Sequence, residues 1–589
     1  MNAQTEVEWL DDQSVQTEGS RVLFWDGRLD NRSDLFVLLK DYLRGDWSNP
    51  ALALAAYKRW GTSGFVHLIG DWSAVIQDDT DRLTVLASDF AGVRPLYYSA
   101  TSGQVLWSSH LQSLVDSTGI SELDEEYLGA FLLYGGCPNR TPYKGIYSVP
   151  AGHSVCISST GTKISRFWSL PVRDEVRYQS AHRYEEELRT LFREAVSVRL
   201  QTEAPVLAEL SGGLDSSSVV SMANHLIRSG AVPAKSLASV SYVWQNSLDE
   251  PFIREMESFC GIKGVHISTH ETPLLSKTHA GSAQPEILQP LRQEVGFLSR
   301  QLRAKVLLTG MTGDLMMGNW FDDSLQVSAS LRRFRFGEAC NDALRWSKIL
   351  RLPVYRVLWQ AMCAGLPPTM APTSVYAKED GSYMVKNSET SLVPSFVERV
   401  GLSGSRNLFS DDWMQASPER RKYFRSLSIT LELRTLQTPE LWQHLDYTHP
   451  FAHRPLVEFL MAVPTSILCQ PGEPRKLMRS ALSNLWPFKL QKRRSKGLFN
   501  APWQEALQPL ANLLFSAKRL NVVDLGFVDR ASIHSRLQRL LIGLDCNHSQ
   551  LRNIVVLELW LRNRGRHTPA DKAGSLAQEF PTQNERERR

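Results

Sequence analysis

Short apolar runs separated by turn residues characterise the N-terminal part of the chain, up to about residue 168. The runs at 22–25 and 72–76 are flanked by Gly, Asp and Asn, a pattern that is typical of antiparallel strands. Between them, residues 50–60 begin with proline and continue with alanine and leucine, which favours a helix. Residues 102–109 and 152–170 predict further strands and a hairpin. We therefore expect the N-terminal part to be an antiparallel, β-rich domain.

The pattern changes after a polar stretch at 173–180, which we interpret as a linker. Residues 184–200 carry apolar side chains at helical spacing. Strand-like apolar runs at 204–210, 236–243 and 304–310 then alternate with helical segments. Because strands that alternate with helices pair in parallel, this pattern predicts a parallel sheet with helices on both faces.

Together these patterns predict a multidomain α/β protein. The antiparallel domain is expected at 1–172, and the parallel-sheet domain at 181–563, with a mostly helical extension beyond Trp320. The polar residues 564–589 are predicted to be a disordered tail. A chain of 589 residues agrees with more than one domain, because a single hydrophobic core rarely spans that length.

The strongest chemical signal is the segment SGGLDSS at 211–217, which lies where a predicted strand ends and a predicted helix begins. The glycines let successive amide N–H groups face one point, and the helix N-terminus adds partial positive charge. The serine hydroxyls add donors, so the segment suits phosphate oxygens. Asp215 fits if it holds a magnesium ion that bridges those phosphates. A glycine-rich turn with a serine N-cap is the plainer interpretation, but it leaves the acid unexplained.

Composition narrows the class of protein further. The formal net charge of +4 is too small for this length to indicate a nucleic-acid-binding surface. Seven scattered cysteines without metal or redox spacing favour a reducing compartment. The sequence shows no signal peptide and no apolar segment long enough to cross a bilayer. We therefore expect a cytoplasmic protein with no membrane span and no nucleic-acid partner.

The loop at 211–217 resembles the pyrophosphate-binding loop of the ATP-pyrophosphatase superfamily, and most of the chain is similar to asparagine synthetases, β-lactam synthetases and lasso-peptide cyclases. The segment LLTGMTGD resembles the second signature loop of these enzymes, and KRRSKGLFNAP carries Lys496 at the position of their catalytic lysine. The resemblance implies a HUP-like fold for residues 181–563, with ATP and Mg²⁺ as cofactors and with metal ligands Asp215 and Asp314. It implies nucleotide contacts from Leu210, Ser211, Gly212, Gly213, Asp215, Ser216, Ser217, Ser241, Tyr242 and Gly310.

The N-terminal segments WDGRLDNRSDL, GDWSAVI and SDFAGVRPLYY resemble the glutaminase domain of the same enzymes, which implies an Ntn-type antiparallel β-sandwich at 1–172. A working glutaminase of this type uses an N-terminal cysteine as its nucleophile. This sequence begins Met1-Asn2-Ala3 and has no cysteine before Cys137. We expect this domain to keep the glutaminase fold without glutaminase chemistry.

One further departure concerns the base that prepares the attacking amine. Met311 stands where asparagine synthetases carry a glutamate, and a thioether cannot accept a proton. The segment DYTHPFAHRPL offers Asp446, His449 and His453 as candidates for this role, and we name Asp446 and His449 with Lys496 as catalytic residues. A structural role for these buried polar side chains remains an open alternative.

The sequence thus predicts an ATP-dependent ligase that adenylates a carboxylate and transfers it to an amine already present in its substrate. The resemblance is greatest to lasso-peptide cyclases, which implies a precursor peptide as substrate and macrolactam formation between an Asp or Glu side chain and the N-terminal amine. It also implies a leader peptidase and a leader-binding protein as partners. A β-lactam synthetase-like or asparagine synthetase-like ligase and a non-catalytic peptide-binding scaffold remain the alternatives.

Overall fold

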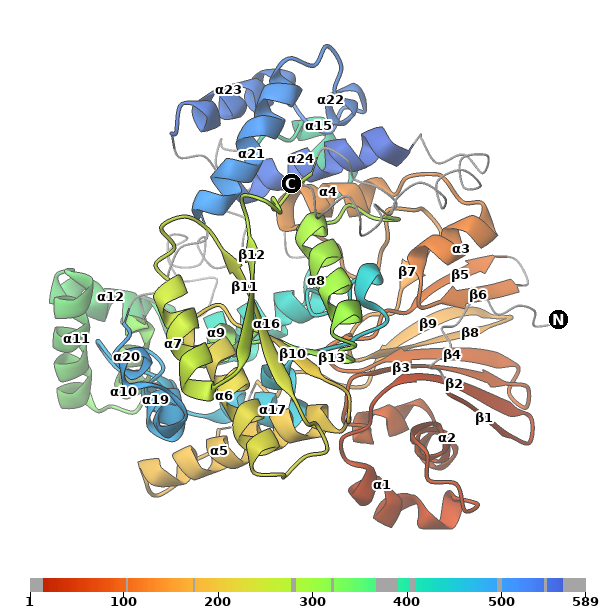
Figure 1. Ribbon diagram of the computed structural model, residues 1–589, viewed down its shortest axis with the longest axis horizontal. Coiled ribbons are helices and arrows are strands. Elements are labelled where there is room, and N and C mark those ends of the chain that lie inside the picture. The colour runs from red at the N-terminus through yellow and green to blue at the C-terminus, as the bar shows by residue number, and fades with distance from the viewer. Residues whose placement is uncertain are drawn as a thin grey trace, which may run out of the picture.

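The computed structural model describes residues 14–101, 104–172, 175–276, 282–318, 323–366, 390–402, 408–494, 500–544 and 548–564. Figure 1 shows an antiparallel β-rich part on the right and a larger part on the left that combines a parallel sheet with many helices. The helix α24 (His548–Arg564) ends at the first residue of the predicted tail, and the rest of that tail lies outside the described residues.

The N-terminal domain is a sandwich of two antiparallel sheets. In the larger sheet the strands lie in the order β1-β2-β3-β4-β8-β9, and in the smaller sheet in the order β6-β5-β7. The strands are β1 (Ser14–Glu18), β2 (Arg21–Gly27), β3 (Trp72–Asp78), β4 (Leu83–Ser88), β5 (Tyr97–Thr101), β6 (Gln104–Ser108), β7 (Tyr147–Ser148), β8 (His153–Ser158) and β9 (Gly161–Arg166).

Alternation of side chains along these strands creates two separate cores. Phe24, Val75, Leu86 and Val155 are paired across β2, β3, β4 and β8, and they pack against Trp107 of the smaller sheet. The opposite face of the larger sheet is covered by helices, and both faces therefore exclude water. The helices of this domain are α1 (Arg32–Leu39), α2 (Asn49–Trp60), α3 (Leu111–Thr118) and α4 (Glu125–Tyr134), with 3-10 turns η1 (Lys40–Tyr42) and η2 (Gly61–His67).

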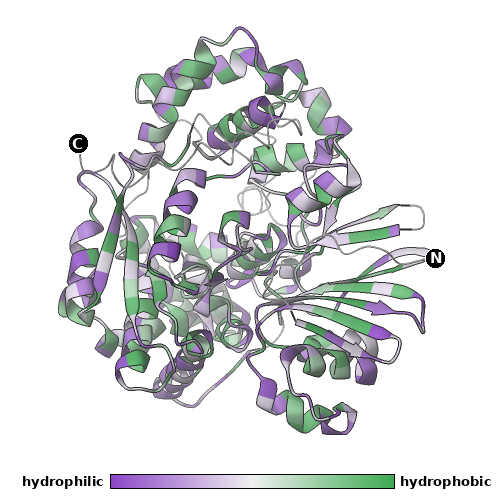
Figure 2. Ribbon diagram, turned by 45° about the vertical axis from the view of Figure 1, so that its right-hand side comes forward, coloured by the Kyte–Doolittle hydropathy of each residue, from purple (hydrophilic) through white to green (hydrophobic). Residues whose placement is uncertain are grey.

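The second domain is built on a parallel sheet with the strand order β12-β11-β10-β13-β14, so that its first strand is central. Figure 2 shows apolar residues along these strands and hydrophilic residues on the surfaces of the surrounding helices. The strands are β10 (Val206–Glu209), β11 (Leu237–Val243), β12 (Lys263–Ser268), β13 (Val306–Leu308) and β14 (Asp446–Thr448). The predicted combination of an antiparallel domain and a helix-covered parallel sheet is confirmed.

Helices cover both faces of the parallel sheet and form two large cores. One core includes α5, α6, α17 and α19, and the other includes α8, α21, α24 and α4 of the N-terminal half. The α-helices are α5 (Ala181–Ser197), α6 (Leu214–Arg228), α7 (Glu250–Cys260), α8 (Gln289–Gln301), α9 (Gly313–Met316), α10 (Val327–Arg332), α11 (Phe336–Leu350), α12 (Val354–Ala364), α15 (Pro394–Arg399), α16 (Arg421–Glu432), α17 (Arg454–Ala462), α18 (Thr465–Leu468), α19 (Lys476–Leu482), α20 (Phe488–Gln491), α21 (Asn500–Phe515), α22 (Asn521–Asp524), α23 (Arg530–Leu541) and α24.

Short 3-10 turns connect several of these helices: η3 (Val198–Leu200), η4 (Ser324–Gln326), η6 (Asp412–Gln415), η7 (Glu440–Trp442), η8 (Pro450–Ala452) and η9 (Ser483–Leu485). The predicted helix at 184–200 is therefore α5 followed by η3. The helix α4 was not predicted, because its nearly continuous apolar run does not distinguish a buried helix from a buried strand.

A buried ionic network joins the two domains. Asp71 precedes β3, and its carboxylate accepts hydrogen bonds from Arg28 at 2.8 Å, from Arg199 at 3.3 Å and from the Thr448 hydroxyl. Asp71 is 1% exposed, and Arg199 and Thr448 belong to the second domain. Burial alone raises the pKa of a carboxyl, but the charges of Arg28 and Arg199 and the Thr448 hydroxyl hold the pKa of Asp71 below its usual value.

The first prediction concerns Asp71→Asn, which removes the carboxylate with which the buried Arg199 forms its ion pair, whereas Arg28 keeps Asp30 and Asp446. We expect a loss of about 3–5 kcal/mol in the free energy of unfolding, because an uncompensated buried charge is strongly destabilising. Urea unfolding followed by circular dichroism measures the shift of the midpoint. The pKa of Asp71 is lowered in the folded protein. The stability difference between Asp71→Asn and the wild type should therefore be largest near neutral pH and should shrink as the pH falls below about 4.

The matched control is Glu203→Gln, which removes one partner of the exposed Lys235–Glu203 ion pair. It should leave the midpoint unchanged, because solvent-exposed ion pairs contribute little. A midpoint of Asp71→Asn equal to that of the wild type would show that the network does not hold the domains together.

Candidate active site

A cavity of about 680 Å³ opens at the carboxyl-terminal ends of β10 and β13. This edge of a parallel sheet is where α/β proteins usually bind ligands. The lining residues come from the loops after both strands, from α11, from α16 and from the segment that precedes α21. They include Glu209, Ser211, Gly213, Asp215, Ser216, Gly310, Met311, Thr312, Asp314, Asp323, Trp346, Ile349, Thr430, Thr435, Cys469, Arg475, Arg479, Arg493 and Arg494.

The loop after β10 has the geometry that its sequence predicted. Gly212 has φ +73°, and a Cβ atom there would lie 2.7 Å from the Asp249 carbonyl oxygen, so only glycine fits. The Ser216 hydroxyl lies 3.0 Å from both the backbone nitrogen and the hydroxyl of Ser211 and holds the loop curled. The helix α6 begins at Leu214 directly behind it, so its free N–H groups point toward the cavity.

The loop after β13 packs directly against this first loop. A Cβ atom on Gly310 would lie 2.5 Å from the backbone nitrogen of Ser216, and one on Gly313 would lie 2.6 Å from a carboxylate oxygen of Asp215. The two glycines therefore let the loops approach closely, and Asp314 follows Gly313 on α9. The structure thus brings the two predicted metal ligands, Asp215 and Asp314, to neighbouring positions at the cavity.

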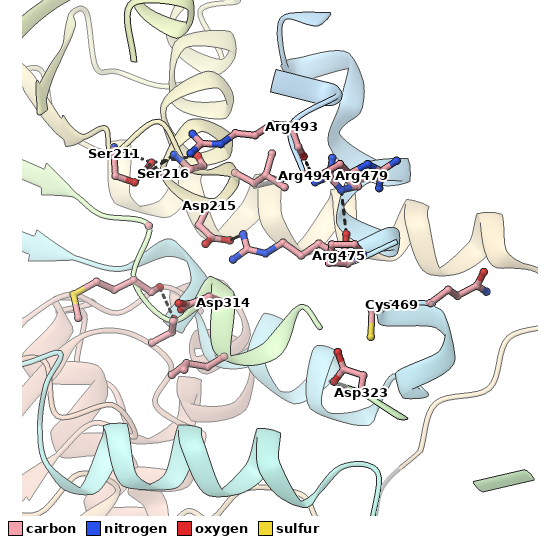
Figure 3. A pocket seen from close by; sticks show the side chains of 18 of the residues that line it. Ser211, Asp215, Ser216, Asp314, Asp323, Cys469, Arg475, Arg479, Arg493 and Arg494 are labelled. Carbon is pink, nitrogen blue, oxygen red and sulfur yellow. Dashed lines mark hydrogen bonds and ion pairs between the residues drawn. The ribbon is translucent and has the colours of Figure 1, made fainter. Parts of the chain in front are cut away.

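Four arginines face these loops across the cavity, and Figure 3 shows them with Asp215 and Asp314. Arg475 forms an ion pair with Asp215, and Arg493 forms one with Asp249 and donates to the Gly212 carbonyl at 2.7 Å. Arg479 donates to the Arg493 carbonyl at 2.6 Å. Burial and the charges of Arg494 and Arg475 lower the pKa of Arg479 to about 10. The guanidinium groups supply N–H donors of the kind that bind phosphate oxygens.

The carboxylates of Asp215 and Asp314 are hard oxygen donors of the kind that Mg²⁺ prefers, and they lie at the loop 211–217. Within the described ranges, three or more His, Cys, Asp or Glu side chains are nowhere grouped as metal ligands. Two carboxylates still fit magnesium, because this ion usually takes one or two protein carboxylates together with phosphate oxygens and water. One oxygen of Asp215 is engaged by Arg475 in this structure.

The remaining predicted nucleotide contacts lie around the ends of β10 and β11. The backbone nitrogen of Leu210 donates to the Val240 carbonyl at 2.9 Å, and the Leu210 side chain is buried. Ser217 and Ser241 are also buried. The Tyr242 hydroxyl donates to Glu209 at 3.3 Å. Lys496 lies outside the described residues, so its catalytic role remains a prediction.

The structure does not bring the two predicted bases to this cavity. Asp446 is level with Val306 at the start of β13 and binds Arg28 at 3.2 Å and Arg94, both from the N-terminal domain. His449 is fully buried, with one ring nitrogen 2.7 Å from the Thr309 hydroxyl and the other 2.9 Å from the Leu436 carbonyl. Burial lowers the pKa of His449 to about 4. This geometry favours structural roles over the catalytic roles that we predicted.

The third candidate, His453, lies in the domain interface, 3.5 Å from Asp30. Sequence reasoning missed several residues that do line the cavity. Arg475 and Arg479 lie in the segment GEPRKLMRSAL, whose charges resemble an ordinary helix surface until the fold turns them inward. Glu209 is a single acid among apolar residues, and Asp323 follows Asp322, so neither gave a signal for a site.

Comparison with known proteins agrees with this arrangement. The family model for asparagine synthase matches residues 187–562, and that for a glutamine amidotransferase domain matches residues 13–168. The chain therefore belongs to the asparagine synthase family. Enzymes of this family are ATP-dependent ligases that form carbon–nitrogen amide bonds, and this chain is such a ligase.

Among its relatives, asparagine synthetase [glutamine-hydrolyzing] 3 of Bacillus subtilis (strain 168) is 26% identical over 79% of this chain and 73% of its own length. Amidase chyE of Penicillium rubens is 31% identical over 31% of this chain and 27% of its own length. A solved structure of a glutamine phosphoribosylpyrophosphate amidotransferase from B. subtilis matches 51% of this chain and 73% of its own, with 14% identity and a TM-score of 0.20, too low to support any argument.

Where the structure describes helices, none is long and apolar enough to cross a membrane.

The second prediction tests the positive charge of the cavity with inorganic pyrophosphate as the probe. Arg494 lines the cavity from an exposed position, so Arg494→Met should fold normally. We expect this variant to bind pyrophosphate about tenfold more weakly at low salt, the cost of one charge-assisted contact. Isothermal titration calorimetry measures the Kd for pyrophosphate. Added salt should reduce the difference in Kd between the variant and the wild type.

Arg254→Met is the control, because Arg254 lies on α7 in an exposed pair with Glu250, away from the cavity. Equal weakening by both variants would mean that overall charge, rather than this cavity, attracts the anion.

Proposed function

We propose that the cavity converts a substrate carboxylate into its acyl-adenylate, with release of pyrophosphate, and then transfers the acyl group to an amine. The observation that carries this proposal is the meeting of four arginines with a glycine-serine loop and two aspartates in one cavity. That arrangement offers several N–H and O–H donors to the phosphate oxygens of a nucleotide. It resembles an ATP-pyrophosphatase site more than a site for a neutral ligand.

In this proposal, different residues of the cavity bind the phosphates, compensate the developing charge and hold the metal ion. The amides and hydroxyls of Ser211 and Ser216 hold the β- and γ-phosphates, and Arg475, Arg479 and Arg493 offset the charge that develops as pyrophosphate leaves. Asp215 and Asp314 would hold magnesium, which supplies charge neutralisation and orients the phosphates. Lys496 is proposed to contact the α-phosphate. Because the cavity is partly closed to water, each of these contacts is stronger than in solution.

Glutamine is not the nitrogen donor in this proposal. In the described part of the N-terminal domain the cysteines are Cys137 and Cys156. Burial raises the pKa of the Cys137 thiol to about 12 and also raises that of Cys156. Thiols with raised pKa values hold little of the thiolate that attacks an amide. This supports a donor amine that belongs to the substrate.

More specifically, we propose that the substrate is a precursor peptide and that the product is a macrolactam. The carboxylate is then an Asp or Glu side chain, and the amine is the peptide's own N-terminus, as in lasso-peptide cyclases. The size of the cavity and its extension toward Trp346, Ile349 and Thr430 leave space beyond the nucleotide. A leader peptidase and a leader-binding protein would be the partners of such an enzyme.

The third prediction uses a synthetic peptide with a free N-terminal glycine and one internal glutamate. With ATP and magnesium, the wild type should release AMP and pyrophosphate and yield a peptide that has lost one water. Asp215→Asn should abolish this turnover and keep the fold, because it removes a metal ligand from the cavity rim. Chromatography of nucleotides and mass spectrometry of the peptide measure both products.

Ser229→Ala, at the far end of α6 from the cavity, serves as a control on the same helix. Release of ADP and phosphate by the wild type would contradict adenylation. Formation of asparagine from aspartate and ammonia, without peptide modification, would favour the asparagine synthetase-like alternative. Release of glutamate from added glutamine would contradict the proposed donor.

The fourth prediction compares two lysines in the same basic run. Lys496→Ala should lower product formation about a hundredfold or more, the usual effect of removing one electrostatic contact to a transition state. Lys492→Ala should change little, because Lys492 is exposed and lies over the Phe488 ring, 4.1 Å from its centroid. Turnover and melting temperature are measured for both. Equal and modest losses would show that the two lysines act only as a diffuse positive patch.

A further inference from the structure

Glu209 is an acid in the cavity that the mechanism above leaves without a role. It is the last residue of β10 and lies two residues before Ser211, so its carboxylate lines the cavity beside the loop 211–217. The Tyr242 hydroxyl, from the neighbouring strand β11, donates to it at 3.3 Å. Ala208 and Leu210 belong to the core on one face of the sheet, so Glu209 faces the other side, with Leu207.

The groups around this carboxylate come from three elements. Tyr242 of β11 and Tyr447 of β14 are neutral phenols at ordinary pH, and Arg292 of α8 is the nearby cation. Burial raises the pKa of Glu209 to about 7, although the Tyr242 hydrogen bond and the Arg292 charge act in the opposite direction. A carboxyl of this kind can change its protonation state near neutral pH, as a general base must.

The other acids that line the cavity are already engaged. Asp215 pairs with Arg475, and Asp314 lies beside it as the second candidate metal ligand. Asp323 accepts a hydrogen bond from Tyr423 at 2.7 Å and forms an ion pair with Lys422. Asp215 and Asp323 are therefore committed to cationic partners, and Asp314 to the candidate metal site.

Glu209 also lies close to the position at which a base is missing from the sequence. Met311 follows Gly310 on the second loop, and the Tyr447 hydroxyl donates to its sulfur at 3.3 Å. Tyr447 in turn interacts with Glu209. Met311 and Glu209 both line the cavity, so a carboxylate from β10 reaches the region that Met311 borders.

We propose that Glu209 is the catalytic residue that accepts the proton of the attacking amine. This inference rests on the proposed function. The amine lone pair forms the new C–N bond at the carbonyl carbon of the acyl-adenylate, and the bond from that carbon to the AMP oxygen breaks with its electron pair. The nitrogen loses one proton to the Glu209 carboxylate, which returns it to solvent after AMP has left.

The test separates adenylation from amide formation in Glu209→Gln, with the synthetic glycine- and glutamate-containing peptide as the probe. Amide formation should fall by about a hundredfold or more, the usual contribution of a general base. Peptide-dependent exchange of pyrophosphate into ATP should fall far less, because that half-reaction needs no base at the amine. Hydroxylamine, which is unprotonated at neutral pH, should trap the acyl-adenylate in the variant as well as in the wild type.

The dependence on pH gives a readout that a structural role would not move. Amide formation by the wild type should rise as the pH passes through about 7, where Glu209 loses its proton. Glu209→Gln should lack the component near 7 and keep only the rise at about pH 8 that comes from deprotonation of the peptide's α-amine. Tyr242→Phe removes a hydrogen bond to the charged carboxylate, so the rise should move to higher pH. Glu257→Gln is the matched control and should keep the rise, because Glu257 is a buried acid that pairs with His266 and does not line the cavity.

Two outcomes would overturn the proposal. A higher KM for ATP with an unchanged kcat in Glu209→Gln would mean that the residue binds the nucleotide. Infrared difference titration of the wild type against Glu209→Gln observes the carboxyl directly and needs no substrate. A midpoint near 7 supports the proposal, whereas ionisation already complete by about pH 5, as for an ordinary glutamate, overturns it. Absence of any pyrophosphate exchange in the wild type would instead contradict the proposed function.

Discussion

Asp71 is a carboxylate almost without contact with water, held between an arginine of each domain. It also accepts a hydrogen bond from the hydroxyl of Thr448, the last residue of β14. The Thr448 carbonyl accepts the backbone N–H of Thr309 at 3.1 Å, and Gly310 comes next on the loop that borders the cavity. The register of the edge strand, and through it the second loop, therefore depends on a charge cluster at the domain boundary. Such a cluster tolerates little displacement, since an unpaired buried charge costs several kcal/mol.

A second constraint is steric and acts inside the cavity. Gly310 and Gly313 have no space for a Cβ atom, so the loops after β10 and β13 come into direct backbone contact. Arginines of the segments around α19 and α20 then contact these loops, and Figure 3 shows Arg475 directed at Asp215. Burial, together with repulsion from Arg494 and Arg475, lowers the pKa of Arg479.

We propose that the N-terminal domain has a structural role instead of the glutaminase role that its family relationship suggests. Its fold is that of a glutamine amidotransferase domain, and a relative bears the name of a glutamine-hydrolysing enzyme. In this chain Arg28, Asp71 and Arg94 are committed to contacts with the second domain. The α4 helix packs against α24 of the C-terminal part as well. We interpret the domain as a support that positions β14 and the helices over the parallel sheet.

The sequence by itself determined the two sheet types, because side-chain period and strand–helix alternation are local properties of the chain. It also singled out the loop at 211–217 with Asp215, since strand, glycines, acid and helix occur in a fixed order along the chain, whereas the resemblance to a known family pointed to Asp314. Only the tertiary structure decided what the isolated polar residues do. Asp446 and His449 bind partners that are distant in sequence, such as Arg94 and Leu436, whereas Glu209 interacts with groups of β11 and α8. The charge state of a side chain depends on such neighbours in space, and no local pattern encodes them.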